Sequence, residues 1–194
     1  MPGILSRESL TELFQELSER LELRRVRAHV YVVGGAAMVL GHSRDRRTED
    51  IDARIESGHT VVVEGVREIA RERGLSEHWP NEQVSAYIPR RRDERARTLF
   101  GSPSLVVTGA SAEHMLAMKL RAGRETDRED IEILMERLDV ETLDEFRAIH
   151  DEVFPDSPLS GRKLRIAERT LAAGRVPNRT DSSADETQPR DPKP

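Results

Sequence analysis

The stretch from His29 to Ile55 constrains the fold more than any other part of the chain. A short run of mostly β-branched residues, typical of a strand, ends at two glycines, Gly34 and Gly35. Small residues typical of a helix follow from Ala36 to Gly41, and after a basic loop the apolar Ile51 stands between two aspartates. This order of strand, turn, helix and second strand predicts that the first half of the chain is mixed α/β.

Asp50 and Asp52 are two residues apart in the expected second strand. Since alternate residues of a strand share a face, both carboxylates would point the same way while Ile51 points into the core. Two carboxylates on one face repel each other unless a cation lies between them. Oxygen ligands of this kind suit Mg²⁺, which keeps several waters and is completed by substrate phosphates.

The overall composition excludes several classes of protein. With 194 residues the chain has room for one domain, or for one core with a helical extension. We expect a cytoplasmic protein, because there is no long apolar run, no leader at Met1 and no cysteine. The net charge of −5 argues against a protein that coats nucleic acid nonspecifically, since such proteins are usually basic.

The remaining patterns predict an α/β core followed by helices. Amphipathic spacing and stop signals predict helices at residues 6–23, 60–73, 112–122, 126–138, 142–154 and 160–174. Short strands are expected at 86–88, 98–100 and 105–108. We therefore expect an α/β core over residues 1–110 and a helical part of the same unit over 111–175. Residues 176–194, with four prolines and almost no apolar residue, are expected to form a disordered tail.

Serine and threonine residues predict where several helices begin. Their hydroxyls can accept a hydrogen bond from an N–H of the first turn, and a glutamate three residues later completes a capping box. The candidates are Ser6 or Ser9 for the first helix, Ser111 for the helix at 112, and the boxes Thr126/Glu129 and Thr142/Glu145.

Two blocks of the sequence carry a family resemblance. The Gly34-Gly35 turn and the Asp50/Asp52 pair together resemble the DNA polymerase β-like nucleotidyltransferase superfamily. More narrowly, the pattern Arg46-x-Thr48-x-Asp50-Ile51-Asp52, with Lys119 and the acids of KLRAGRETDREDIEIL, is similar to the AbiEii/MenT-like toxin nucleotidyltransferases (DUF6036-like). The resemblance covers residues 29–55 and 111–135. It implies an α+β nucleotidyltransferase fold, with a small mixed β-sheet, flanking helices and a helical C-terminal half.

The resemblance also implies roles for the glycines and the two aspartates. Gly34 and Gly35 would open a helix beneath a nucleoside triphosphate, where glycine lets the backbone approach closely and a helix N-terminus favours anions. Asp50 and Asp52 would hold Mg²⁺ ions that polarise the α-phosphate, activate an attacking hydroxyl and stabilise the leaving pyrophosphate. The alternative interpretation is a loop turn followed by two surface acids.

Three residues before the first aspartate are further candidates for nucleotide binding. Arg46 and Arg47 could pair with phosphates as bidentate forks, or could be solvated residues of a loop. Thr48 shares the face of Asp50 if the strand extends that far back. The resemblance places it near the phosphates, whereas the alternative is a hydroxyl that bonds its own backbone.

Lys119 is one of only three lysines among 31 basic residues, which suggests a requirement for a compact charge, and we expect that charge on the triphosphate. The alternative is a helix lysine whose stem covers apolar surface. Asp127 and Asp130 are expected in the first turn of the next helix, where acids stabilise the helix dipole. The resemblance implies that one of them supports the acceptor: Asp127 has the family's Arg-x-x-Asp spacing from Arg124, and Asp130 precedes apolar residues. The strand at 105–108 carries no third acid, which leaves the general base unassigned.

These observations predict an Mg²⁺-dependent nucleotidyltransferase that moves a nucleotide from an NTP to an RNA 3′ end. The family resemblance makes tRNA the leading acceptor, and it implies a toxin countered by a cognate antitoxin. One alternative is an acceptor that is a protein or a small molecule such as an aminoglycoside, and another is a non-catalytic binding module. The arginine-rich segment 90–97 could grip an RNA backbone or form a charged surface loop.

Overall fold

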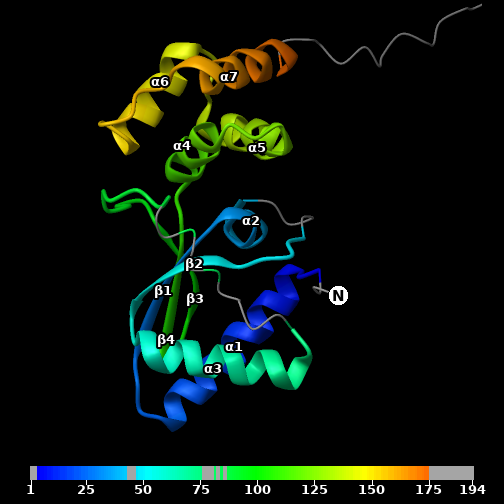
Figure 1. Ribbon diagram of the computed structural model, residues 1–194, viewed down its shortest axis with the longest axis vertical. Helices are drawn as coiled ribbons and strands as arrows, with labels where there is room; N and C mark the ends of the chain where they lie inside the picture. The colour runs from blue at the N-terminus through cyan, green and yellow to red at the C-terminus, as the bar shows by residue number, and fades with distance from the viewer. Residues whose placement is uncertain (1–3, 43–46, 76–80, 82–83, 85–86, 175–194) are drawn as a thin grey trace, which may run out of the picture.

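The computed structural model describes residues 4–42, 47–75, 81, 84 and 87–174 (Figure 1). The chain forms a four-stranded mixed sheet with flanking helices, and further helices lie beyond one end of the sheet. The expected α+β class with a helical C-terminal half is thereby confirmed. The elements are α1 Arg7–Leu23, β1 Ala28–Val33, α2 Gly34–Ala37, the π-helical segment η1 Met38–His42, β2 Asp52–Ser57, α3 His59–Arg73, β3 Arg97–Gly101, β4 Leu105–Gly109, α4 Ala112–Ala122, the 3₁₀ turn η3 Glu125–Asp127, α5 Arg128–Leu138, α6 Leu143–Val153 and α7 Gly161–Gly174.

β1 is an inner strand of the sheet, and the residues at its carboxyl end pair with both neighbouring strands, β2 and β4. The strand order is β2-β1-β4-β3, with β1 antiparallel to β2 and parallel to β4, and with β3 antiparallel to β4. Val33 pairs with Asp52, and Gly109 pairs with both Val32 and Arg97. The end of β1 therefore lies level with the start of β2, the end of β4 and the start of β3.

The two faces of the sheet differ in polarity. Val30 and Val107 pair across β1 and β4 on the buried face, and α1 packs there through Phe14, whose ring lies 6.1 Å from that of Phe100. On the other face, Tyr31 lies beneath the guanidinium of Arg54, which is 5.3 Å from the ring centroid. One face thus builds the core with α1, and the other carries polar and charged side chains.

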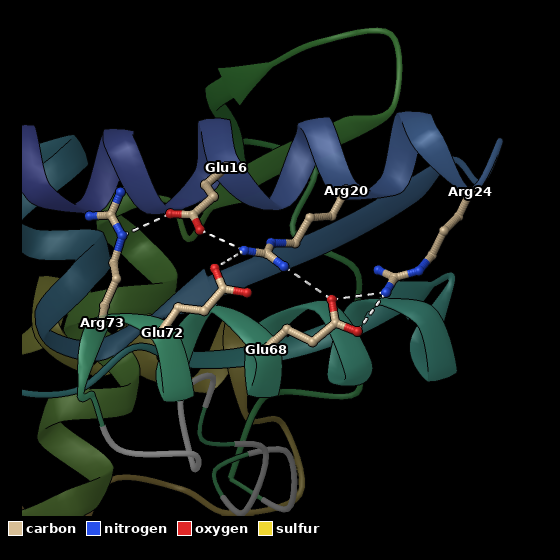
Figure 2. Close-up of polar contacts among 6 residues, drawn as sticks. All are labelled: Glu16, Arg20, Arg24, Glu68, Glu72 and Arg73. Carbon is tan, nitrogen blue, oxygen red and sulfur yellow. Dashed lines mark hydrogen bonds and ion pairs between the residues drawn. The ribbon is translucent and has the colours of Figure 1, made fainter.

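A ladder of ion pairs joins α1 to α3, which run side by side (Figure 2). Arg20 of α1 contacts Glu16 on its own helix at 2.8 Å and Glu68 and Glu72 of α3 at 3.1 and 2.5 Å. Arg24 also contacts Glu68, at 2.7 Å. These guanidinium groups lower the pKa of the Glu68 carboxyl, so the ladder keeps its charges at neutral pH.

The helices α4–α7 lie beyond the end of the sheet at which α2 begins (Figure 1). The hydroxyl of Ser111 caps α4, and Thr142 with Glu145 forms the expected capping box at α6. α4 connects the sheet to this group and packs against α5, α6 and α7. No helix of the described ranges is long and apolar enough to cross a membrane.

Several local predictions were wrong because tertiary contacts or tighter turns replace the expected pattern. The helix expected at 36–41 begins already at Gly34 and widens into a π-helical segment at Met38. Of the two cap candidates for α1, Ser6 is the one that caps the helix, which agrees with one of the stated alternatives. The strand expected at 86–88 is absent among the residues described there, since Ile88 instead donates its N–H to Val84 in a turn.

The start of α5 also differs from the prediction. Thr126 makes no capping box with Glu129, because residues 125–127 form a 3₁₀ turn and the helix begins at Arg128. Asp127 is therefore at the N-cap position rather than in the first turn, and its side chain is used elsewhere. The tail predicted at 176–194 lies outside the described residues.

Candidate active site

The turn after β1 lies directly against the first residue of β2. Because Val33 pairs with Asp52, the next residue, Gly34, faces the Asp52 side chain. A Cβ at Gly34 would lie 2.5 Å from the Asp52 Oδ2 atom, and Gly34 has a φ of +64°, a conformation that other residues rarely adopt. Only glycine therefore fits beside this carboxylate.

The second glycine of the turn lies against Thr48 in the same way. A Cβ at Gly35 would overlap the Thr48 hydroxyl oxygen. Thr48 is held by a backbone bridge to Leu5, and its hydroxyl donates to the Asp50 carbonyl at 2.9 Å. Its hydroxyl thus bonds the local backbone, as the alternative interpretation expected, and also contacts the glycine turn.

Asp50 and Asp52 are close to each other but differ in exposure. Asp50 is exposed and precedes β2, which begins only at Asp52, so the expectation that both lie within the strand was wrong for Asp50. Asp52 is partly buried, and burial together with the charge of Asp50 raises the pKa of the Asp52 carboxyl. Ile51 between them is buried in the core, as expected.

Asn81 orients the Asp52 carboxylate. Its backbone pairs with the start of β2, and its side-chain amide donates to the Asp52 Oδ1 atom at 3.0 Å. This hydrogen bond partly offsets the rise in the Asp52 pKa. No local sequence pattern marks Asn81, because it stands in a stretch without periodicity and reaches Asp52 only through tertiary structure.

Lys119 joins the two later candidate acids. Its ammonium group lies 2.7 Å from the Asp127 Oδ1 atom and 2.5 Å from the Asp130 Oδ2 atom. The Lys119 and Asp130 side chains are only 10% and 6% exposed, whereas that of Asp127 is 16% exposed. Both acids thus contact the lysine, and Asp127 is the more exposed of the two.

Two cations of this helical part lie close enough to Asp52 to influence its pKa. Arg124 and Lys119 both lower the pKa of Asp52, against the larger effect of burial. Arg124 is exposed and makes no ion pair with any residue in the described ranges. The sequence marked it only by its spacing to Asp127, yet it is a cation near the Asp50/Asp52 pair.

The two remaining candidates for nucleotide binding are Arg46 and Arg47. Arg47 is exposed, and Arg46 lies outside the described residues. Within the described ranges, no group of three or more histidine, aspartate or glutamate side chains is arranged to hold a metal ion. Asp50 and Asp52 are therefore a pair without a third such protein ligand in that part of the chain.

A glycine turn against a carboxylate pair, with two cations close enough to lower the Asp52 pKa, suits a ligand that carries charge. A family model described as nucleotidyltransferase of unknown function (DUF6036) matches residues 8–165, from α1 into α7. No curated protein and no solved structure matches the chain significantly. Since the family model spans most of the chain, including both blocks of the candidate site, the protein belongs to this nucleotidyltransferase family of unknown function, DUF6036.

Proposed function

We propose that the protein is an Mg²⁺-dependent enzyme that transfers a nucleoside monophosphate from an NTP to the 3′ end of an RNA, with release of pyrophosphate. The observation that carries this proposal is the contact between the Gly34 turn and Asp52. It brings a backbone without side chains and a partly buried carboxylate to one place. Phosphates and a cation are the ligands that suit these two groups.

Asp50 and Asp52 would hold the metal. The raised pKa of Asp52 means that its charged form lacks compensation, which a divalent cation would supply. Two carboxylates also suit Mg²⁺, because this ion is usually bound by one or two carboxylates and completed by waters and phosphates. When bound, Mg²⁺ supplies Lewis-acid polarisation and charge neutralisation on the triphosphate.

The chain's own residues would position the nucleotide. Gly34 and Gly35 are partly exposed, so the backbone N–H groups of the turn would be the groups that meet phosphate oxygens, and Arg124 offers an exposed guanidinium suited to a phosphate. Lys119 contributes positive charge, but its ammonium is engaged by two aspartates. We therefore assign the direct phosphate contact to Arg124 and a positioning role to Lys119, which revises the role expected from the sequence.

Asp127 is the better candidate for contact with the acceptor hydroxyl. Its carboxylate is more exposed than that of Asp130, and it follows Arg124 by three residues in the η3 turn. A base must come within hydrogen-bond reach of the proton that it takes, so exposure favours Asp127. Asp130 would hold Lys119 in place.

The test uses α-labelled NTPs, one at a time, with Mg²⁺ and total cellular RNA. Label on RNA in the wild type and its loss in Asp52→Asn would support the proposal, since asparagine keeps the shape but removes the charge. Asp156→Asn, which makes the same change at an exposed residue after α6, is the matched control and should retain full activity. Label on a tRNA-sized band would identify the acceptor class.

Other outcomes would contradict the acceptor or the enzymatic proposal. Label on a protein, or on an added aminoglycoside, would exclude RNA as the preferred acceptor while keeping the chemistry. No label with a folded protein that still binds Mg-NTP would favour a binding module. The toxin role, in the cytoplasm and with a cognate antitoxin, predicts that expression arrests growth in the wild type but not in Asp52→Asn.

A further inference from the structure

A pocket lies beside η1, the segment that follows α2 and the Gly34 turn. Its volume is about 330 Å³, and its walls come from η1, the facing parts of β3 and β4, the start of α4 and the end of α5. This volume is within the range of small-ligand pockets. None of the candidate active-site residues Gly34, Asp50, Asp52 or Lys119 lines it.

The pocket is strongly basic although the protein is acidic. Arg95, Arg97 and Arg137 line it, and Glu113 is the only acidic residue among the described residues of the lining. The charges of Arg137 and Arg97 lower the pKa of His42, a further lining residue, in addition to the larger effect of its burial. In a chain with a net charge of −5, three cations in one concavity are a local reversal of sign that would attract anions.

The arginines are only weakly compensated within the described part of the chain. Arg97 is exposed and makes no ion pair there. Arg95 lies 3.6 Å from Glu113 and 3.9 Å from Glu152, which are long distances for ion pairs. Arg137 donates only to the carbonyl oxygen of Gly41, at 3.0 Å. Their guanidinium groups can therefore accept an anionic partner without first breaking a strong contact.

Several converging guanidinium groups suit a phosphate, because each can form two parallel hydrogen bonds and a phosphate has enough oxygens to accept from more than one of them. The three arginines come from three different segments, the loop before β3, β3 itself and the end of α5. The start of α4 also lines the pocket, and the amino end of an 11-residue helix favours negative charge.

The pocket lies at the same end of the sheet as the candidate active site. Arg97 pairs with Gly109, which pairs with Val32 of the strand that leads to Gly34. Ala37 lines the pocket and Gly34 begins the same helix, so the four residues of α2 link the two places. A strand that enters the active site with its 3′ end can extend across α2 and η1 towards the pocket.

We propose that this pocket binds a phosphate group, and that the phosphate belongs to the backbone of the acceptor RNA a short distance from its 3′ end. The assignment to RNA rests on the proposed function, whereas the affinity for phosphate does not. The same chemistry would accept a free phosphate or a mononucleotide, and the experiment separates these sources.

The test measures binding rather than catalysis, so that an inactive enzyme would still give a result. Fluorescence anisotropy follows a labelled, short single-stranded RNA, and a thermal shift follows inorganic phosphate and AMP. The variants are Arg97→Gln, Arg97→Lys and Glu113→Gln. Arg67→Gln is the matched control, because Arg67 is an exposed arginine on α3 and does not line the pocket.

We expect Arg97→Gln to weaken RNA binding by about tenfold or more, the effect of one hydrogen bond between charged groups. It should also lower the slope of log affinity against log salt by about 0.7, because one phosphate contact is lost from a single strand. Arg97→Lys should retain part of the affinity, and Arg67→Gln should bind as the wild type does. Glu113→Gln should bind RNA more tightly, a gain that misfolding cannot produce.

A different outcome would assign the pocket to a small ligand. In that case Arg97→Gln would lose the thermal shift with phosphate or AMP but would keep the RNA affinity of the wild type. If neither RNA affinity nor the phosphate shift differs between Arg97→Gln and Arg67→Gln, the proposal is overturned. Binding of Mg-ATP should be unchanged in Arg97→Gln. If the wild type does not bind Mg-ATP at all, the proposed function is refuted, and the result for the phosphate pocket still holds.

Discussion

Replacement of Lys119 by methionine tests whether the Lys119–Asp127–Asp130 cluster is a buried structural unit. Methionine has a similar unbranched length, so it keeps most of the packing and removes the charge. The change leaves two carboxylates, one of them 6% exposed, without their cation. Removal of one partner from a buried ion pair generally costs 3–5 kcal/mol, because the remaining charge stays buried without compensation.

The expected loss is therefore about 3 kcal/mol in the free energy of unfolding, at the lower end of this range because Asp127 is partly exposed. At roughly 2–4 °C per kcal/mol for a chain of this size, the melting temperature should fall by about 6–12 °C. A further substitution, Asp130→Asn, removes the buried charge and should recover about half or more of the loss. Asp127→Asn in the same background should recover less, since water already solvates part of that carboxylate.

The measurement is urea unfolding followed by circular dichroism, with Lys163→Met as the control. Lys163 is partly exposed on α7, and the same change there should alter the stability by less than about 0.5 kcal/mol. If Lys119→Met costs no more than this control, the cluster contributes nothing as a buried ion pair. If Asp130→Asn fails to restore stability, the loss has a cause other than the uncompensated carboxylate.

Three further changes test other parts of the structure. Gly34→Ala should reduce stability by about 1–3 kcal/mol and remove activity, because alanine is strained at the positive φ of residue 34 and its Cβ would displace the Asp52 side chain. A variant with full activity would contradict the close contact between Gly34 and Asp52. Asp52→Asn should raise stability by about 1 kcal/mol at neutral pH. Because the pKa of Asp52 is raised on folding, the folded state binds more protons than the unfolded state at pH values between the ordinary aspartate pKa and the raised one. The wild type should therefore lose stability as the pH rises through this window, and Asp52→Asn should not. Arg20→Met should lower stability by about 1–2 kcal/mol, since three ion pairs of the ladder in Figure 2 are lost, and salt should reduce the difference; equal unfolding curves at low salt would refute this.

Local sequence patterns were sufficient for most of the fold. The strand before Gly34, the strand at 105–108 and the helix capped by Ser111 follow from residues that are neighbours along the chain. The failures have a common physical origin. The start of α5 could not be placed by its capping signal, because Asp127 bonds Lys119 and the preceding residues form a 3₁₀ turn instead.

For the candidate site, the sequence by itself determined the chemistry of the strand–turn–helix block, in which Gly34 and Asp52 are both recognisable. Only the tertiary structure decided that they touch, that Asn81 orients Asp52, and that Lys119 holds both later acids. It also brought Arg97 and Arg137 to one pocket from separate elements. The reason is that periodicity and caps depend on interactions between near neighbours in the chain. Contacts between distant residues depend on strand register and helix packing, which form only when the whole core is assembled.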